Sequence, residues 1–255
     1  MLSTPRMIKT YGIIGITLIL FFALWLGRGL FVKVVTTNSV KAETSFDSLP
    51  EVLTYEGIDS VLNLFEQTTY ENLDPDYIAY AGYDTYSKSE LMKGRLFYKI
   101  KNSDTLKPLV GKYRLGQFLP VDNVHYKDIL PDDERYFQYL CLDKKIIYRF
   151  LDLILMLRKN GYTDDFRIKD GYRYPSFNKR TGGATYSQHI YGLAIDLYIG
   201  DINKDDRFDE KKDKKIVYDY LDKNIIKNTG GLGRYPGGNV VHFDLRGHGA
   251  RWDKQ

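Results

Sequence analysis

The chain has 255 residues, of which 43% are hydrophobic and 27% charged, which is enough for one or two domains with an apolar core. Its formal net charge of +4 comes from basic residues interleaved with acidic ones. This pattern argues against a nucleic-acid binder, in which basic residues gather on one face or in one run. A single cysteine excludes an internal disulfide.

The N-terminal residues predict a membrane anchor. Residues 11–27, YGIIGITLILFFALWLG, carry no charge and are long enough to span a bilayer. Arg6 and Lys9 precede this segment, so the positive-inside rule places residues 1–10 in the cytoplasm and the rest of the chain outside it. We therefore predict a single-pass membrane protein with a linker at residues 28–50. A cleaved signal peptide, which would make the protein secreted, is the alternative.

Residues 51–135 contain short tyrosine-rich patches separated by glycine and proline. Residues 59–67 fit one or two helical turns. The segments LFYKIKN and VGKYRLGQFLP are typical of short strands. We predict a strand-containing N-terminal region, to which the sequence assigns no role.

Residues 136–255 read as a second domain. Apolar residues recur at helical spacing in residues 143–160, with Asp143 as a suitable N-cap. A strand is expected at residues 166–169, followed by a long turn-rich stretch. Two further strands, at residues 194–199 and 240–245, flank a helix at residues 211–227. This order predicts an α+β fold, in which helices pack on an antiparallel sheet.

Both of the last two strands carry polar side chains within an apolar pattern. Successive side chains of a strand point to opposite faces, so Asp196 faces away from its apolar neighbours, and His242 shares a face with Asp244. Buried polar groups need a partner. A metal shared with His189, on the loop before the first of these strands, would supply one and leave a position open for water. A core histidine beside a capping aspartate is the alternative.

Three motifs in this domain resemble one known family. Residues 187–196, SQHIYGLAID, read S-x-H-x-x-G-x-A-x-D; residues 171–178, GYRYPSFN, read G-Y-R-x-P-x-x-N; and residues 241–244, VHFD, are followed by Arg251 and Trp252. Together they resemble the zinc D-alanyl-D-alanine carboxypeptidase and dipeptidase superfamily, the LAS-type peptidoglycan peptidases, and most of all its small carboxypeptidase-like branch. The resemblance covers residues 142–252. It implies a zinc peptidase domain at residues 136–255.

The resemblance also implies site residues. The family's zinc ligands fall on His189, Asp196 and His242. Its loop arginine, which binds the carboxylate or carbonyl of the substrate, falls on Arg173, and a guanidinium suits that role because it can donate two parallel hydrogen bonds. Arg173 is also expected to stabilise the oxyanion that develops during catalysis. With it we expect Ser187 and Tyr191 to line the substrate-binding site.

The general base does not follow from the motif. Many relatives use a glutamate three residues before the last ligand, or a histidine two residues before it, and these positions hold Asn239 and Val240. Asp244 lies on the metal-facing side of the same strand as His242, so we predict Asp244 as the catalytic base. The alternatives are that Asp244 orients His242 or itself binds the metal.

A second cation site is suggested by residues 201–209, DINKDDRFD. Its acidic and amide side chains alternate as at the start of an EF-hand loop, so calcium would bind Asp201, Asn203, Asp205 and Asp209. The loop departs from the EF-hand pattern at two positions. Asp206 stands where a glycine is needed, and Lys212 stands where a bidentate glutamate is needed.

These observations predict a bacterial zinc metallopeptidase, anchored in the cytoplasmic membrane, that hydrolyses a peptide bond of peptidoglycan stems or cross-links. The bond could be that of a D,D- or L,D-carboxypeptidase or of an endopeptidase. A non-catalytic, zinc-containing module that binds the cell wall is the alternative, favoured by the missing glutamate or histidine base. A zinc hydrolase acting on another exported peptide is a third reading.

Overall fold

The computed structural model describes residues 50–120 and 137–253. They belong to one compact unit. In the two described ranges no helix is both long and apolar enough to cross a membrane. The predicted membrane anchor at residues 11–27 lies outside the described residues.

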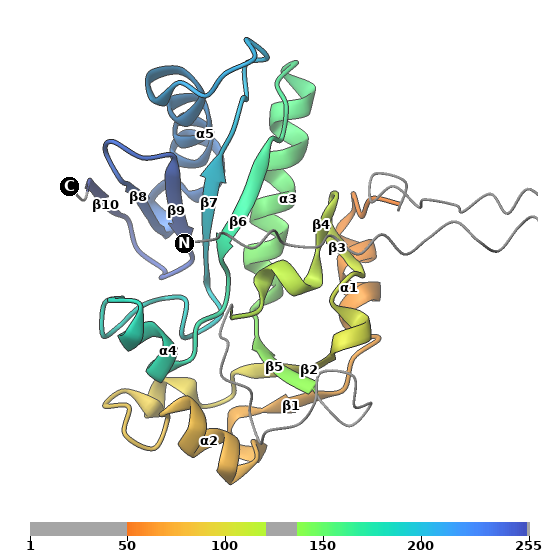
Figure 1. The fold of residues 1–255 in the computed structure, drawn as a ribbon, viewed down its shortest axis with the longest axis vertical. Helices are drawn as coiled ribbons and strands as arrows, with labels where there is room; N and C mark the ends of the chain where they lie inside the picture. The colour runs from red at the N-terminus through yellow and green to blue at the C-terminus, as the bar shows by residue number, and fades with distance from the viewer. Residues whose placement is uncertain (1–49, 121–136, 254–255) are drawn as a thin grey trace, which may run out of the picture. The chain divides into compact units, whose positions relative to one another are not determined.

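A five-stranded sheet carries the candidate site (Figure 1). In spatial order its strands are β10 (Ala250–Asp253), β8 (Gly231–Arg234), β9 (Val240–Asp244), β7 (Ala194–Ile199) and β6 (Phe166–Asp170). Neighbouring strands run antiparallel except β10 and β8, which are parallel. The predicted α+β class with antiparallel pairing is confirmed, with this one parallel pair as an addition.

Helix α3 (Lys144–Lys159) packs on this sheet. Asp143 caps it by accepting a hydrogen bond from the backbone N–H of Lys145, as predicted. The fully buried Phe150 ring lies 6.3 Å from that of Phe243 on β9 and 5.9 Å from that of Phe166 on β6. Burial of each such ring stabilises the fold by about 1.5–3 kcal/mol, so this contact fixes the helix against the two strands.

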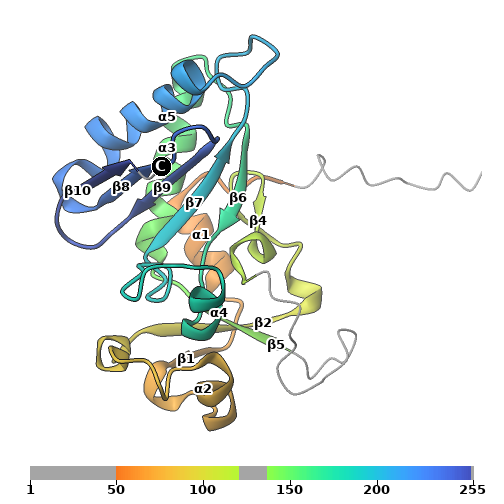
Figure 2. The ribbon, with the colours of Figure 1, turned by 60° about the vertical axis from the view of Figure 1, so that its left-hand side comes forward.

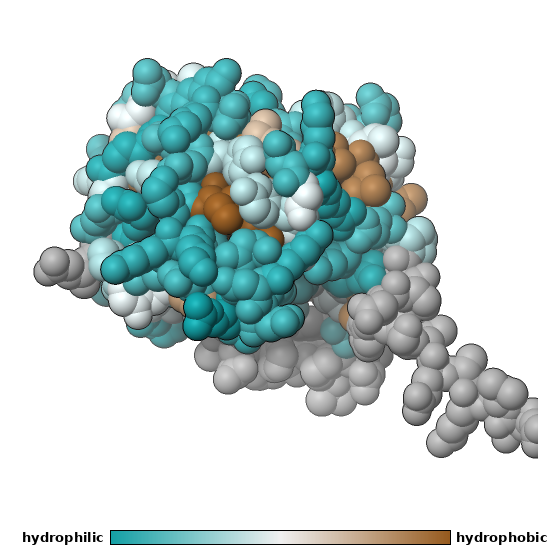
Figure 3. All heavy atoms as spheres, turned by 90° about the horizontal axis from the view of Figure 1, so that it is seen from above, coloured by the Kyte–Doolittle hydropathy of each residue, from teal (hydrophilic) through white to brown (hydrophobic). Residues whose placement is uncertain are grey.

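The predicted helix at residues 211–227 is also present. It consists of α5 (Lys215–Tyr220) between two π-helical segments, Glu210–Lys214 and Leu221–Ile226. Figure 2 shows this helical stretch beside α3. The end of the molecule at which both helices stand has a largely hydrophilic surface with small hydrophobic areas (Figure 3).

The N-terminal part of the described chain surrounds a second sheet. Its antiparallel strands are β1 (Gln67–Thr69), β2 (Leu96–Lys101) and β5 (Phe137–Cys141). A two-stranded hairpin and two helices accompany it, namely β3 (Pro108–Val110), β4 (Tyr113–Arg114), α1 (Tyr55–Leu62) and α2 (Pro75–Ala81). Because β5 leads directly into α3, this sheet joins the N-terminal region to the chain that carries the candidate site.

Tyrosine hydroxyls connect the two parts near the site. The hydroxyl of Tyr172 lies 2.9 Å from that of Tyr77 and 2.8 Å from that of Tyr83. The hydroxyl of Tyr86 lies 2.7 Å from that of Tyr191. Tyr172 and Tyr191 belong to the two loops that hold the predicted arginine and the first predicted histidine. The N-terminal region therefore holds both loops in place through buried hydrogen bonds.

Candidate metal centre

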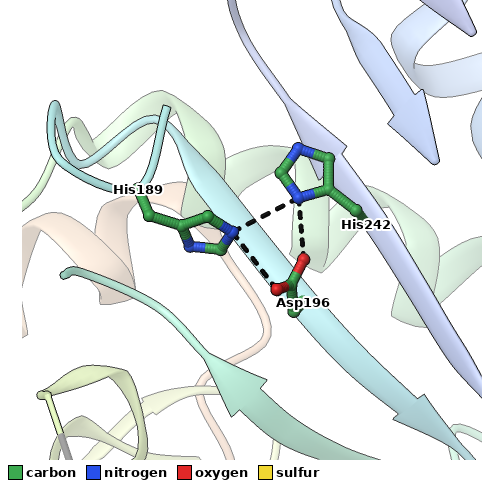
Figure 4. A group of neighbouring side chains, drawn as sticks. All are labelled: His189, Asp196 and His242. Carbon is green, nitrogen blue, oxygen red and sulfur yellow. Dashed lines mark hydrogen bonds and ion pairs between the residues drawn. The ribbon is translucent and has the colours of Figure 1, made fainter. Parts of the chain in front are cut away.

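Two paired strands and one loop bring the predicted metal ligands together (Figure 4). In the β7–β9 pair Asp196 lies directly opposite His242. His189 lies on the loop before β7, and its carbonyl accepts a hydrogen bond from the backbone N–H of Arg173 at 3.2 Å. All three side chains are buried. Strand alternation therefore delivers two of them to one face, and the loop delivers the third.

The three side chains converge on one point. His242 Nδ1 lies 2.7 Å from Asp196 Oδ1, and His189 Nε2 lies 3.3 Å from both His242 Nδ1 and Asp196 Oδ2. Their ligand atoms all lie within 4.8 Å of one another. Among the described residues this is the one group of histidine, cysteine and acidic side chains with such spacing.

Hydrogen bonds on the outer side of each imidazole fix which nitrogen carries the proton. His189 Nδ1 lies 2.6 Å from the carbonyl oxygen of Gly171, which can only accept, so Nδ1 must donate. His242 Nε2 lies 2.8 Å from Asp244 Oδ2 and donates to that carboxylate. His189 Nε2 and His242 Nδ1 are therefore the nitrogens that face each other and Asp196. Metal-binding histidines are oriented in this way. Without a metal His242 Nδ1 donates to Asp196 Oδ1, which can only accept; burial acts to lower the pKa of His242, but Asp196 and Asp244 outweigh it and raise that pKa.

The electrostatics of the group fit a cation. Burial lowers the pKa of His189 below its usual value, which favours the neutral imidazole that binds metals. Burial acts to raise the pKa of Asp196, but the two histidines outweigh it and hold that pKa well below the usual range. Two imidazole lone pairs and one carboxylate at these separations match the nitrogen and oxygen donor set of catalytic zinc, in which three protein ligands leave a fourth position open.

A cavity of about 530 Å³ opens beside this group. Three cationic side chains line it together with the two histidines and Asp196, namely Lys169, Arg173 and Arg246. One Arg173 nitrogen, Nη2, lies 3.3 Å from Asp196 Oδ2, whereas its buried Nε has no hydrogen-bond partner. Arg173 thus lines the cavity beside the predicted ligands, and its role in binding substrate stays a prediction.

Of the other two predicted substrate-binding residues, one lines the cavity and one does not. Ser187 lines the cavity beside His189. Tyr191 is not among the lining residues, because its buried side chain turns toward the N-terminal region and bonds to Tyr86. The structure therefore gives Tyr191 a place in the support of the loop, in contrast to the predicted contact with substrate.

Asp244 has both carboxylate oxygens engaged. Oδ1 accepts from the backbone N–H groups of Gly231 and Arg246 at 2.9 and 3.1 Å. Oδ2 accepts from His242 Nε2 at 2.8 Å and from Arg246 Nη2 at 2.6 Å. Asp244 is fully buried and does not line the cavity. These contacts fit the alternative in which Asp244 orients His242, and they leave no oxygen directed at the cavity for the predicted base role.

Sequence reasoning missed the aromatic packing behind His242. The Trp252 ring on β10 lies 5.1 Å from the His242 ring. The Arg246 guanidinium lies over the Trp252 ring, 4.9 Å from its centroid. Gly233 on β8 makes room for the indole, since a Cβ at that position would lie 2.5 Å from Trp252 atoms. A Gly-rich segment such as GLGR gives no strand signal, and therefore this contact was not foreseen.

Replacing Gly233 by alanine is expected to displace the Trp252 indole and to lower the free energy of unfolding by about 1–3 kcal/mol, as overpacking does. Denaturant unfolding of the two proteins measures the difference. Gly238→Ala, in the same hairpin, is the matched control because its nearest neighbouring atom would lie 3.7 Å from the new Cβ. Equal losses in both variants would contradict the packing role of Gly233.

The predicted calcium loop satisfies its own polar groups. Asp201 accepts hydrogen bonds from the backbone N–H groups of residues 204–206, and Asn203 accepts one from that of Asp205. Asp209 caps the following helical segment. The Lys212 ammonium lies 3.0 Å from Asp205 Oδ2 and so adds a positive charge where an EF-hand supplies a carboxylate. The geometry gives no support to calcium binding here.

Comparison with known proteins agrees with the site. Residues 139–222, about a third of the chain, match the family model described as peptidase M15. This segment is similar to the peptidase M15 family. The matched segment runs from β5 to just beyond α5 and contains His189 and Asp196, whereas His242 lies beyond the match. No curated protein and no solved structure matches the chain. The match confirms the predicted resemblance for residues 139–222 and supports a zinc-dependent metallopeptidase.

Proposed function

We propose that this protein is a zinc peptidase that hydrolyses a peptide bond in peptidoglycan stems or cross-links. The observation that carries the proposal is the convergence of His189 Nε2, Asp196 and His242 Nδ1, with the other nitrogen of each imidazole held by Gly171 or Asp244. The M15 match and the cavity beside the group support a peptidase. The substrate class rests on the resemblance of the three motifs to cell-wall peptidases.

The residues in and behind the cavity would have three separate roles. His189, Asp196 and His242 would hold the zinc, which when bound lowers the pKa of a water molecule and polarises a carbonyl. Arg173, whose side chain lines the cavity, would donate to a carboxylate or carbonyl oxygen of the peptide. Asp244 keeps His242 in place and in the correct tautomer, and Arg246 in turn holds Asp244.

We further propose that the protein is anchored in the bacterial cytoplasmic membrane by residues 11–27, with residues 28–255 on the outer side. The uncharged stretch and the preceding Arg6 and Lys9 support this topology. Peptidoglycan lies on the outer side of the membrane, so the proposed topology places the candidate site on the same side as the proposed substrate. Protease added to intact cells should remove the C-terminal end of the protein and spare residues 1–10.

Digestion of purified peptidoglycan by the full-length protein tests the peptidase proposal. Mass spectrometry of the products should show the loss of one terminal residue or of a cross-link, and a zinc chelator should abolish it. The product also identifies the bond and so separates carboxypeptidase from endopeptidase. Intact peptidoglycan after incubation with zinc-loaded protein would contradict the proposal.

One observation favours a second candidate, a zinc-containing module that binds the cell wall without cleaving it. Among the described residues that line the cavity, Asp196 is the sole carboxylate, so none of the others can act as a carboxylate base. Such a module would bind peptidoglycan in a sedimentation assay and release no fragments. The same digest therefore distinguishes the two candidates.

A further inference from the structure

The Tyr235 side chain lines the same cavity, at a position that none of the motifs includes. It follows β8 in sequence and shares the cavity wall with Asp196 and His242. The Trp252 side chain lines this cavity as well, and its ring lies 5.1 Å from the His242 ring. Tyr235 and Trp252 thus share the cavity wall beside the candidate metal centre.

The backbone that carries Tyr235 is held in place by a buried cation. Residues 235–238 form a turn, closed by a hydrogen bond of 3.2 Å from Gly238 N to Tyr235 O, with Gly237 at φ 77° as a proline–glycine turn requires. The buried Lys214 ammonium donates to the carbonyls of Tyr235 and Gly238 at 2.8 and 2.6 Å and pairs with Glu210 at 2.6 Å. Because a buried ammonium needs several acceptors, these contacts fix the turn.

The Tyr235 hydroxyl is a hydrogen-bond donor among charged groups. Burial raises the pKa of Tyr235, and the Asp196 carboxylate raises it further, so the phenol stays protonated at neutral pH. Lys169 and Arg173 line the same cavity and act on this pKa in the opposite sense. A protonated phenol in the cavity wall can donate a hydrogen bond to an acceptor that enters the cavity.

We propose that Tyr235 is a catalytic residue whose hydroxyl donates a hydrogen bond to the scissile carbonyl oxygen as negative charge develops on that oxygen. This inference rests on the proposed peptidase function and adds a residue to it. A donor that is oriented before the reaction stabilises the transition state more than the bound substrate. The turn held by Lys214 supplies that orientation.

The variant Tyr235→Phe tests the assignment, because it removes the hydroxyl and keeps the ring. In the full-length protein we expect kcat to fall about a hundredfold, as it does when one oxyanion donor is removed, with KM and zinc content unchanged. The matched control is Tyr218→Phe. Tyr218 lies on α5 under the Arg234 guanidinium, 4.7 Å from the ring centroid, and does not line the cavity, so its loss should leave kcat unchanged.

Two readouts do not depend on turnover. In the metal-free protein, one of the two tryptophan indole ¹⁵N–H signals should shift in Tyr235→Phe, since Trp252 lines the same cavity as Tyr235. In the zinc-loaded protein, Tyr235→Phe should raise the dissociation constant of acetohydroxamate about three- to tenfold, which corresponds to the loss of one neutral hydrogen bond. Tyr218→Phe should change neither quantity.

The outcomes separate this proposal from the proposed function. Equal hydroxamate affinity of the unmutated and Tyr235→Phe proteins would overturn the role of Tyr235, whatever the substrate is. Weaker affinity in the variant, together with intact peptidoglycan after incubation with the unmutated protein, would retain Tyr235 as a donor to bound ligands and overturn the substrate. A fall in KM and kcat together with loss of the zinc would overturn the catalytic assignment in favour of a structural one.

Discussion

Asp196→Asn is expected to abolish zinc binding and peptidase activity while leaving the chain folded. Asparagine has the same shape but lacks the charge on which His189, His242 and Arg173 converge. The loss in zinc affinity should exceed the 10- to 100-fold typical of residues that merely orient a ligand, so we expect roughly a thousandfold. Metal analysis after dialysis against a weak chelator, together with the peptidoglycan digest, measures both effects.

The matched control for this variant is Asp219→Asn. Asp219 lies on α5, where it pairs with Lys215 and Lys223 on the surface. Removal of exposed pairs of this kind changes stability by less than about 1 kcal/mol, and it should leave zinc content and activity unchanged. An Asp196→Asn protein that retains stoichiometric zinc would contradict the ligand assignment.

Asp244→Asn is expected to weaken zinc binding by about 10- to 100-fold, since it removes the acceptor that sets the His242 tautomer. The neutral amide also replaces the anion that pairs with the Arg246 guanidinium, and its N–H group cannot accept a hydrogen bond from Arg246. Breaking a buried charge pair costs about 3–5 kcal/mol, and the lower end applies because the Arg246 side chain is 25% exposed. Zinc titration and denaturant unfolding measure the two quantities.

Added zinc separates the two roles considered for Asp244. If Asp244 orients His242, saturating zinc should restore much of the activity of Asp244→Asn. If Asp244 is the base, activity stays lost at every zinc concentration and zinc affinity stays normal. Asp222→Asn, which breaks the exposed pair with Arg251, is the control and should leave zinc affinity unchanged.

The elements that position the metal ligands could be predicted because they are strongly patterned. Residues 194–199 and 240–244 have strand character, interrupted by Asp196 in the first segment and by His242 and Asp244 in the second, and Asp196 and His242 fall opposite each other in the observed register. Helix α3 carries both a capping aspartate and an apolar stripe. Local pattern and tertiary structure agree in these segments, which is the condition under which such reasoning succeeds.

The features that were missed have different causes. Strand β8 contains two glycines, and its strand conformation is explained by pairing with β9 and by the room that Gly233 leaves for Trp252. Helix α2 lies in a tyrosine-rich stretch that reads as strands, although Asp74, Pro75 and Gly82 are ordinary start and stop signals for a helix. The role of Asp244 depended on Arg246, whose position no local pattern reveals.

A zinc-edge anomalous diffraction map of the zinc-loaded protein tests the central claim most directly. The account predicts one peak, in contact with His189 Nε2, a carboxylate oxygen of Asp196 and His242 Nδ1, with Asp244 hydrogen-bonded to His242 and not to the metal. A peak held by other side chains, or a direct bond from Asp244 to the zinc, would contradict it.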